Sequence, residues 1–128
     1  CASPEEVFAQ ADFVSLHCPG GEATYHLIST EALKAMKPTA FLVNSARGDV
    51  IDEAALVAAL RDGEIAGAGL DVFEKEPAVS PELLEMENVV LLPHLGSATL
   101  ETRKAMGMRV VENIDAFFNG ETPRDKLV

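Results

Sequence analysis

The chain has 128 residues, 48% of them hydrophobic, which is enough for one domain with a buried core. Its 21 acidic residues against 10 basic ones give a formal net charge of −11, and no basic run could neutralise a row of phosphates, which argues against a nucleic-acid partner. No apolar run approaches the roughly 20 residues that span a bilayer, so we expect a cytoplasmic protein that contacts no membrane.

Cys1 and Cys18 are the only cysteines of the sequence. They lack the CxxC spacing of metal and redox sites, so we predict neither a disulfide framework nor a metal site. Because the chain begins Cys-Ala-Ser-Pro without an initiator methionine, we also expect it to be part of a longer protein.

Helices and strands are predicted to alternate along the chain. Short runs rich in β-formers predict strands over 12–17, 40–45, 66–72 and 88–93. None of them alternates between polar and apolar residues, so we expect each strand to be buried on both faces. Helices are predicted over 4–10, capped by Ser3, over 30–36, capped by Ser29, and over 53–62, capped by Asp52 and ended by Gly63.

A last helix is predicted from Thr99 to the residue before Gly120. It carries Met106, Val110, Ile114, Phe117 and Phe118 at helical spacing. We interpret this apolar stripe as ordinary core packing rather than as a cofactor-binding feature.

Parallel strands joined by helical crossovers give an open α/β sheet, a Rossmann-like doubly wound fold. Ligands of such sheets bind at the carboxyl ends of the strands, where this chain has polar or small residues at 17–19, 44–48, 71 and 94–97. No GxGxxG occurs, and we interpret Gly67-Ala68-Gly69 as a strand packed closely under a helix. Either the fold is not a nucleotide fold, or only its C-terminal half is present.

His94 and Arg47 are the strand-end residues best suited to chemistry. His94 precedes a small-residue turn at a helix start, and it could be a structural histidine or an acid/base. Arg47 could hold a substrate carboxylate through its planar guanidinium, or could form an ion pair with Asp49 or Asp52.

Three carboxylates lie near other strand ends. Glu74 and Glu76 could be solvated loop residues, or either one could lie against His94 and favour its charged form. Asp71 follows a buried strand, where an unpaired carboxylate is costly, so we expect it to have a specific partner.

The stretch LHCPGG contains His17 and Cys18, and its glycines permit a close backbone approach to a ligand. A reactive thiol needs electropositive neighbours and a positioned base, so we do not predict cysteine hydrolase chemistry. His26, in a polar loop, is predicted to be a surface residue. No HExxH-like spacing supports a metal site at His17 and His94.

The chain contains, in order, the motifs LHCPGGEATYHLI, LVNSARGDVIDEAAL, GAGLDVFEKEP and NVVLLPHLGSAT. In this order and spacing they resemble the D-isomer-specific 2-hydroxyacid dehydrogenases, most closely the glyoxylate/hydroxypyruvate reductase branch. The likeness extends from about Ser3 to the C-terminus. One departure is Gly20-Gly21, where the family commonly has an apolar residue after the HxP motif.

The resemblance implies a catalytic site of Arg47, Glu76 and His94. Arg47 would bind the substrate's carboxylate and keto group, His94 would be the acid/base, and Glu76, which immediately precedes the proline of its motif, would hold the imidazole. NAD or NADP is the implied cofactor. The residues expected to bind it are Cys18, Pro19, Ser45, Ala46, Arg47, Asp71, His94, Gly96 and Ser97.

By the same resemblance, residues 1–98 form the second half of an NAD(P)-binding domain, and residues 99–128 form a helix and tail that return toward a substrate-binding domain. The full-length protein is expected to be a homodimer that reduces a small 2-keto acid, such as glyoxylate or hydroxypyruvate, to a D-2-hydroxy acid, whereas this chain alone is expected to be inactive. Two alternatives stay open: a non-catalytic, cofactor-sensing module of corepressor type, and a trimmed structural core without function. The presence of all three catalytic residues favours the enzyme.

Overall fold

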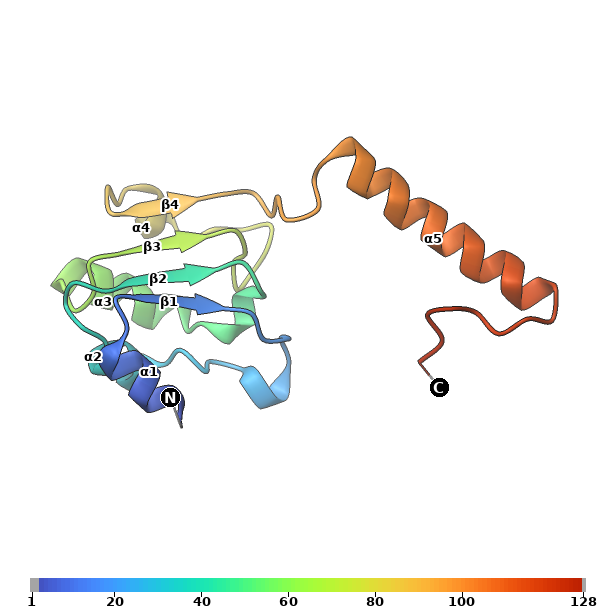
Figure 1. Ribbon diagram of the computed structural model, residues 1–128. Coiled ribbons are helices and arrows are strands. Elements are labelled where there is room, and N and C mark those ends of the chain that lie inside the picture. Colours follow the sequence, from blue (N-terminus) through green and yellow to red (C-terminus); the bar gives the residue numbers. More distant parts are fainter. Residues whose placement is uncertain (1–2, 128) are drawn as a thin grey trace. The chain divides into compact units, whose positions relative to one another are not determined.

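The computed structural model describes residues 3–127 of the chain (Figure 1). The chain divides into two compact units, Cys1–His94 and Leu95–Val128. The elements are, in chain order, α1 (Pro4–Gln10), β1 (Phe13–Leu16), α2 (Thr30–Ala35), β2 (Phe41–Asn44), α3 (Glu53–Asp62), β3 (Gly67–Leu70), α4 (Pro81–Leu84), β4 (Val89–Leu91) and α5 (Leu100–Phe118), with 3-10 turns at Glu22–Thr24 and Gly48–Val50.

The first unit contains a sheet of four parallel strands in the order β1-β2-β3-β4. Each predicted strand is found, and helices separate the strands along the chain, which confirms the α/β, Rossmann-like fold class. Because all four strands run in the same direction, their carboxyl ends lie along one edge of the sheet (Figure 1).

The predicted helix ends of the first unit are confirmed. The side chains of Ser3, Ser29 and Asp52 each accept a hydrogen bond from the backbone N–H three residues further on. Each bond satisfies one N–H that a helix start leaves without a partner. Gly63 ends α3 in the left-handed conformation, with φ 70°, which glycine adopts without steric cost.

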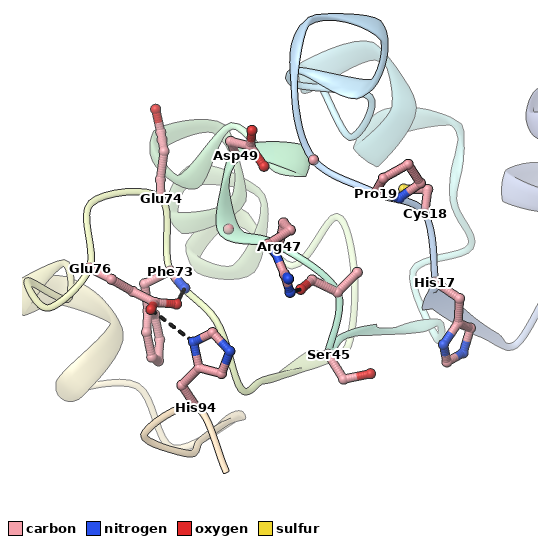
Figure 2. Close-up of a pocket in the computed structure, with 13 residues that line it drawn as sticks. His17, Cys18, Pro19, Ser45, Arg47, Asp49, Phe73, Glu74, Glu76 and His94 are labelled. Carbon is pink, nitrogen blue, oxygen red and sulfur yellow. Dashed lines mark hydrogen bonds and ion pairs between the residues drawn. The ribbon is translucent and has the colours of Figure 1, made fainter. Parts of the chain in front are cut away.

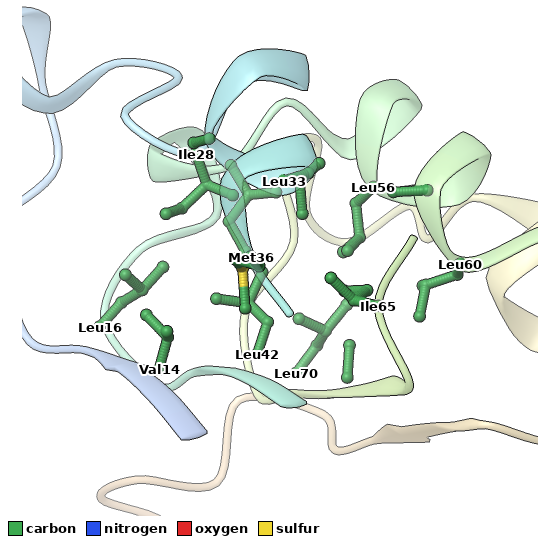
Figure 3. Packing of buried hydrophobic residues seen from close by; sticks show 14 of the residues in the cluster. Val14, Leu16, Ile28, Leu33, Met36, Leu42, Leu56, Leu60, Ile65 and Leu70 are labelled. Carbon is green, nitrogen blue, oxygen red and sulfur yellow. The ribbon is translucent and has the colours of Figure 1, made fainter. Parts of the chain in front are cut away.

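One hydrophobic core lies between the sheet and helices α1 to α3 (Figure 3). Leu33 of α2, Leu42 of β2 and Leu56 of α3 are completely buried in it. In β1 and β2 exposed and buried residues alternate, and Phe13 is 70% exposed. The prediction that every strand is buried on both faces is therefore wrong for β1 and β2, because these helices cover only one face. It is also wrong for β4, in which no residue is buried and Val90 is 64% exposed.

Strand β3 confirms the strand interpretation of Gly67-Ala68-Gly69. A Cβ atom on Gly67 would lie 2.5 Å from the carbonyl oxygen of Asn88 and 3.0 Å from the ring of Phe41. The close neighbours of Gly67 are thus the chain entering β4 and a side chain of β2. The predicted close packing under a helix is wrong at this position.

The second unit begins at Leu95 and contains α5 and the segments on either side of it. Thr99 caps α5 by accepting a hydrogen bond from the N–H of Thr102 at 3.2 Å, and Asp125 folds back to bond with Asn113. No residue of α5 is buried, so the prediction that its apolar stripe is core packing is wrong for this chain. A single helix with a short returning segment has no second layer with which to enclose that stripe.

Within residues 3–127, no helix combines the length and the apolarity that are needed to cross a membrane.

Leu42→Ala should destabilise the fold by about 2–5 kcal/mol, because it removes a completely buried side chain from a central strand and leaves a cavity. Val90→Ala, at a position of β4 that is 64% exposed, is the control and should change the free energy of unfolding by less than about 0.5 kcal/mol. Denaturant unfolding of both variants measures the difference. An equal loss of unfolding free energy in the two variants would contradict the assignment of the core to one face of the sheet.

Candidate active site

A pocket of about 950 Å³ lies at the carboxyl ends of the strands, within the first unit (Figure 2). It combines segments that follow β1, β2 and β3 with His94, which follows β4. The lining residues are His17, Cys18, Pro19, Gly20, Ser45, Ala46, Arg47, Gly48, Asp49, Phe73, Glu74, Glu76 and His94.

His94 and Glu76 form a hydrogen-bonded pair on one side of this pocket (Figure 2). The Nδ1 atom of His94 lies 2.9 Å from Oε2 of Glu76. An ionised carboxylate can only accept, so Nδ1 carries a proton and donates it. This bond occupies Nδ1 and leaves Nε2 as the ring nitrogen that can exchange a proton with a ligand.

The groups around Glu76 favour the ionised form of its carboxyl group. The pKa of its carboxyl group is lowered, chiefly by the hydrogen bond from His94 and next by the bond that its Oε1 accepts from the backbone N–H of Phe73 at 3.0 Å. The charges of His94 and Arg47 act in the same direction, whereas partial burial acts against them. Glu76 is thus a fixed negative charge beside the imidazole.

Arg47 lies in the lining of the pocket and forms no direct ion pair among the described residues (Figure 2). Its Nη1 donates to the carbonyl oxygen of Ala46 at 2.7 Å. Among the described residues no carboxylate lies within 4.0 Å of the guanidinium, so neither Asp49 nor Asp52 forms the ion pair that was the alternative. A planar guanidinium in this state can bind a carboxylate ligand.

Asn44 holds the turn that carries Arg47. The residue is 1% exposed at the end of β2. Its Nδ2 donates to the carbonyl oxygen of Arg47 at 2.9 Å, and its Oδ1 accepts from the N–H of Ala46 at 3.0 Å. Asn44 was predicted to lie at a strand end but was not among the predicted site residues. A carboxamide at the end of an apolar strand was the available signal, because a buried amide needs partners.

Gly48 brings the loops after β2 and β3 into direct contact. A Cβ atom at this position would lie 1.9 Å from the carbonyl oxygen of Phe73. Only a residue without a side chain permits this approach. The contact joins the segment that carries Arg47 to the segment that carries Glu76.

Seven of the predicted site residues line the pocket, namely Cys18, Pro19, Ser45, Ala46, Arg47, Glu76 and His94. Asp71 is buried at the end of β3 and is not among the lining residues. Gly96 and Ser97 belong to the second unit, whereas the pocket is formed within the first.

Glu74, the other carboxylate considered for His94, contacts a different histidine. Its Oε1 lies 3.2 Å from Nε2 of His26, whose Nδ1 lies 3.8 Å from Asp52. The side chain of His26 is 26% exposed, and its ring stacks on Tyr25 at 3.9 Å. His26 is therefore only partly exposed rather than a fully exposed surface residue, because its loop folds back onto the start of α3.

Gly20 stands where the resembled family commonly has an apolar residue. A Cβ atom there would lie 2.5 Å from Oδ1 of Asp49, and Oδ2 of Asp49 accepts a hydrogen bond from the N–H of Gly21 at 2.9 Å. Gly20 and Asp49 thus lie close together in the lining of the pocket, and a side chain at position 20 would require the Asp49 carboxylate to move.

The family model for the D-isomer specific 2-hydroxyacid dehydrogenase, NAD binding domain, matches residues 1–96. The chain therefore belongs to this family. Because the matched region is the family's NAD-binding domain, its cofactor is a nicotinamide dinucleotide.

The chain is similar to glyoxylate reductase of Thermococcus onnurineus, at 56% identity over 93% of this chain and 36% of that protein. Glyoxylate/hydroxypyruvate reductase B of Erwinia tasmaniensis is 50% identical over 94% of this chain and 38% of that protein. Among solved structures, the NADPH-dependent glyoxylate/hydroxypyruvate reductase of Sinorhizobium meliloti, in complex with NADP and malonate, matches with a TM-score of 0.88 at 45% identity, over 91% of this chain and 36% of that one. The chain thus spans little more than a third of the length of these relatives.

Gly48→Ala should destabilise the protein by about 1–3 kcal/mol and displace the loop that carries Arg47, because the new methyl group meets the backbone of Phe73 rather than a movable side chain. Gly107→Ala is the matched control, since a Cβ atom at that position of α5 would meet no described atom within 4 Å beyond its own helix backbone, and alanine should stabilise the helix by up to about 1 kcal/mol. Thermal unfolding measures both. A Gly48→Ala variant as stable as the wild type would contradict the loop contact.

His94→Asn should raise the pKa of Glu76 toward its ordinary value, because the bond from His94 is the largest cause of the lowering. Asparagine tolerates the left-handed backbone at this position, φ 55°. A lowered folded-state pKa means that the pair stabilises the fold above pH 4.5, the ordinary value, and that this stabilisation is lost as pH falls through the folded-state pKa.

A carbon-13 NMR titration of the glutamate carboxyl groups measures this change. Glu82, whose pKa is lowered by the Ser80 side chain, is the internal reference and should titrate identically in both proteins. An unchanged Glu76 midpoint in His94→Asn would contradict the pairing.

Proposed function

We propose that this chain is part of an NAD(P)-dependent D-2-hydroxyacid dehydrogenase that reduces a small 2-keto acid, glyoxylate or hydroxypyruvate, to the 2-hydroxy acid. Residues 1–98 would contribute the second half of its nucleotide-binding domain, and residues 99–128 a helix and tail that return toward a substrate-binding domain. In support, the relatives named above are about three times as long as this chain and are glyoxylate or glyoxylate/hydroxypyruvate reductases.

One observation carries the proposal: a His94–Glu76 pair and Arg47, which has no carboxylate partner among the described residues, line the same pocket. The histidine can transfer a proton, and Arg47 can bind an anion. A 2-keto acid needs both groups, because its carboxylate must be held while its keto oxygen gains a proton.

The position of the pocket and the residues that line it are compatible with a bound nicotinamide dinucleotide. It lies beyond the carboxyl ends of parallel strands, the usual ligand position in such sheets, and Cys18, Pro19, Ser45 and Ala46 line it with small side chains. We propose that these residues contact the cofactor, together with Arg47, Asp71, His94, Gly96 and Ser97. When bound, the reduced nicotinamide supplies the hydride for the carbonyl carbon.

The residues of this chain would supply the remaining chemistry. Arg47 would orient the substrate through its carboxylate, and the proton on Nε2 of His94 would pass to the keto oxygen. Glu76 would keep the ring oriented through Nδ1 and stabilise the imidazolium before the transfer. In the reverse reaction neutral His94 would accept the hydroxyl proton.

Turnover by the full-length protein tests the proposal. With NADH or NADPH, oxidation of the cofactor should depend on added glyoxylate or hydroxypyruvate. A full-length protein that binds the cofactor without turnover would instead favour the corepressor-type module. A homodimeric assembly stays a prediction from the family resemblance, and a cytoplasmic location stays a prediction from the sequence.

Arg47→Lys should lower kcat/KM for the keto acid by about 10- to 100-fold, mainly through KM, because an ammonium group cannot replace a bidentate guanidinium–carboxylate contact. Arg61→Lys, an exposed change in α3, is the control and should leave both constants unchanged. Steady-state kinetics measures the effect, and an unchanged KM in Arg47→Lys would refute the assigned role.

A further inference from the structure

The segment 74–80, which we call the 74–80 loop, carries Glu76 and is held at both ends by one carboxylate. Oε2 of Glu53 accepts a hydrogen bond from the backbone N–H of Glu74 at 3.1 Å, and Oε1 of Glu53 accepts one from the backbone N–H of Ser80 at 3.0 Å. Both bonds are partly buried. Bonds from N–H groups to a charged oxygen are among the strongest that a loop can make.

The attachment is reciprocal at the first end of the loop. Oε2 of Glu74 accepts from the backbone N–H of Glu53 at 3.4 Å, and its Oε1 contacts His26. Within the loop, Lys75 and Ala78 form an antiparallel bridge, in which the N–H of Ala78 donates to the carbonyl oxygen of Lys75 at 2.9 Å. The chain around Glu76 is therefore a closed turn whose two ends are tied to the start of α3.

The side chain of Glu53 has no part in capping its own helix. Asp52 provides that cap, because its Oδ1 accepts from the N–H of Ala55 at 3.0 Å. Both carboxylate oxygens of Glu53 are directed to the 74–80 loop instead. An acidic residue at the first position of a helix is common. Here the two carboxylate oxygens of Glu53 instead hold a loop that is distant in the sequence.

We propose that Glu53 is a positioning residue of the site: by holding both ends of the 74–80 loop, it sets the place from which Glu76 meets His94. The inference rests on the proposed function, since it assigns Glu53 a role in the same reaction. Glu53 acts through Glu76 and touches neither substrate nor cofactor.

Titration of the Glu76 carboxyl group and steady-state kinetics of the full-length protein test the proposal. Glu53→Ala should raise the pKa of Glu76 toward its ordinary value and lower kcat by about 10- to 100-fold, with little change in the KM of the keto acid, because Arg47 is not displaced. Glu53→Gln, which keeps one acceptor oxygen, should lie between Glu53→Ala and the wild type. Glu87→Ala, the same change at an exposed position outside the loop, is the control and should alter neither quantity.

Far-UV circular dichroism confirms that each variant is folded, and Glu53→Gln provides the comparison if Glu53→Ala does not fold. Folded Glu53 variants in which Glu76 titrates as in the wild type would overturn the inference while the proposed function stands. Failure of the proposed function has a different result: the wild-type protein would show no keto-acid turnover, whatever the Glu53 variants do to Glu76. A purely structural role would lower the melting temperature and leave the Glu76 titration unchanged, which also overturns the inference.

Discussion

The backbone of Gly48 lies against the carbonyl group of Phe73 at a distance that no Cβ atom could occupy. A parallel sheet brings the carboxyl ends of neighbouring strands to one edge, but it does not fix how the loops beyond that edge meet. Here the missing side chain lets the loop after β2 rest directly on the loop after β3. Arg47 precedes this contact by one residue, and Glu76 follows it by three, so both side chains reach the same pocket.

The pocket contains both carboxylates and a guanidinium, and they differ in whether they already have a hydrogen-bonding or ionic partner. Asp49, Glu74 and Glu76 each accept hydrogen bonds from backbone N–H groups or from a histidine. The guanidinium of Arg47 bonds to a backbone carbonyl oxygen and, among the described residues, pairs with no carboxylate. In a protein with a formal net charge of −11, this leaves a localised positive group able to receive a small anion, beside a histidine whose orientation is fixed.

The predictions that succeeded rest on interactions between residues close in the sequence. Ser3, Ser29 and Asp52 cap helices through bonds to the third residue further on, and Gly63 ends a helix through its own backbone freedom. The strand positions follow from local runs of β-forming residues. Which faces the strands bury depends on where the helices pack, and for that reason the exposure of Phe13 and of the α5 stripe could not be obtained from the same pattern.

The sequence alone was sufficient for the α/β fold class and for the positions of Arg47 and His94 at strand ends. From the residues it left Glu74 and Glu76 equivalent, and the family resemblance distinguished them; in the structure Glu76 meets His94. The bonds of Glu53 to residues 21 and 27 positions away had no signature in the sequence. Local propensity acts over one turn or one strand, whereas the partners of a side chain in the site depend on which loops the folded sheet brings together.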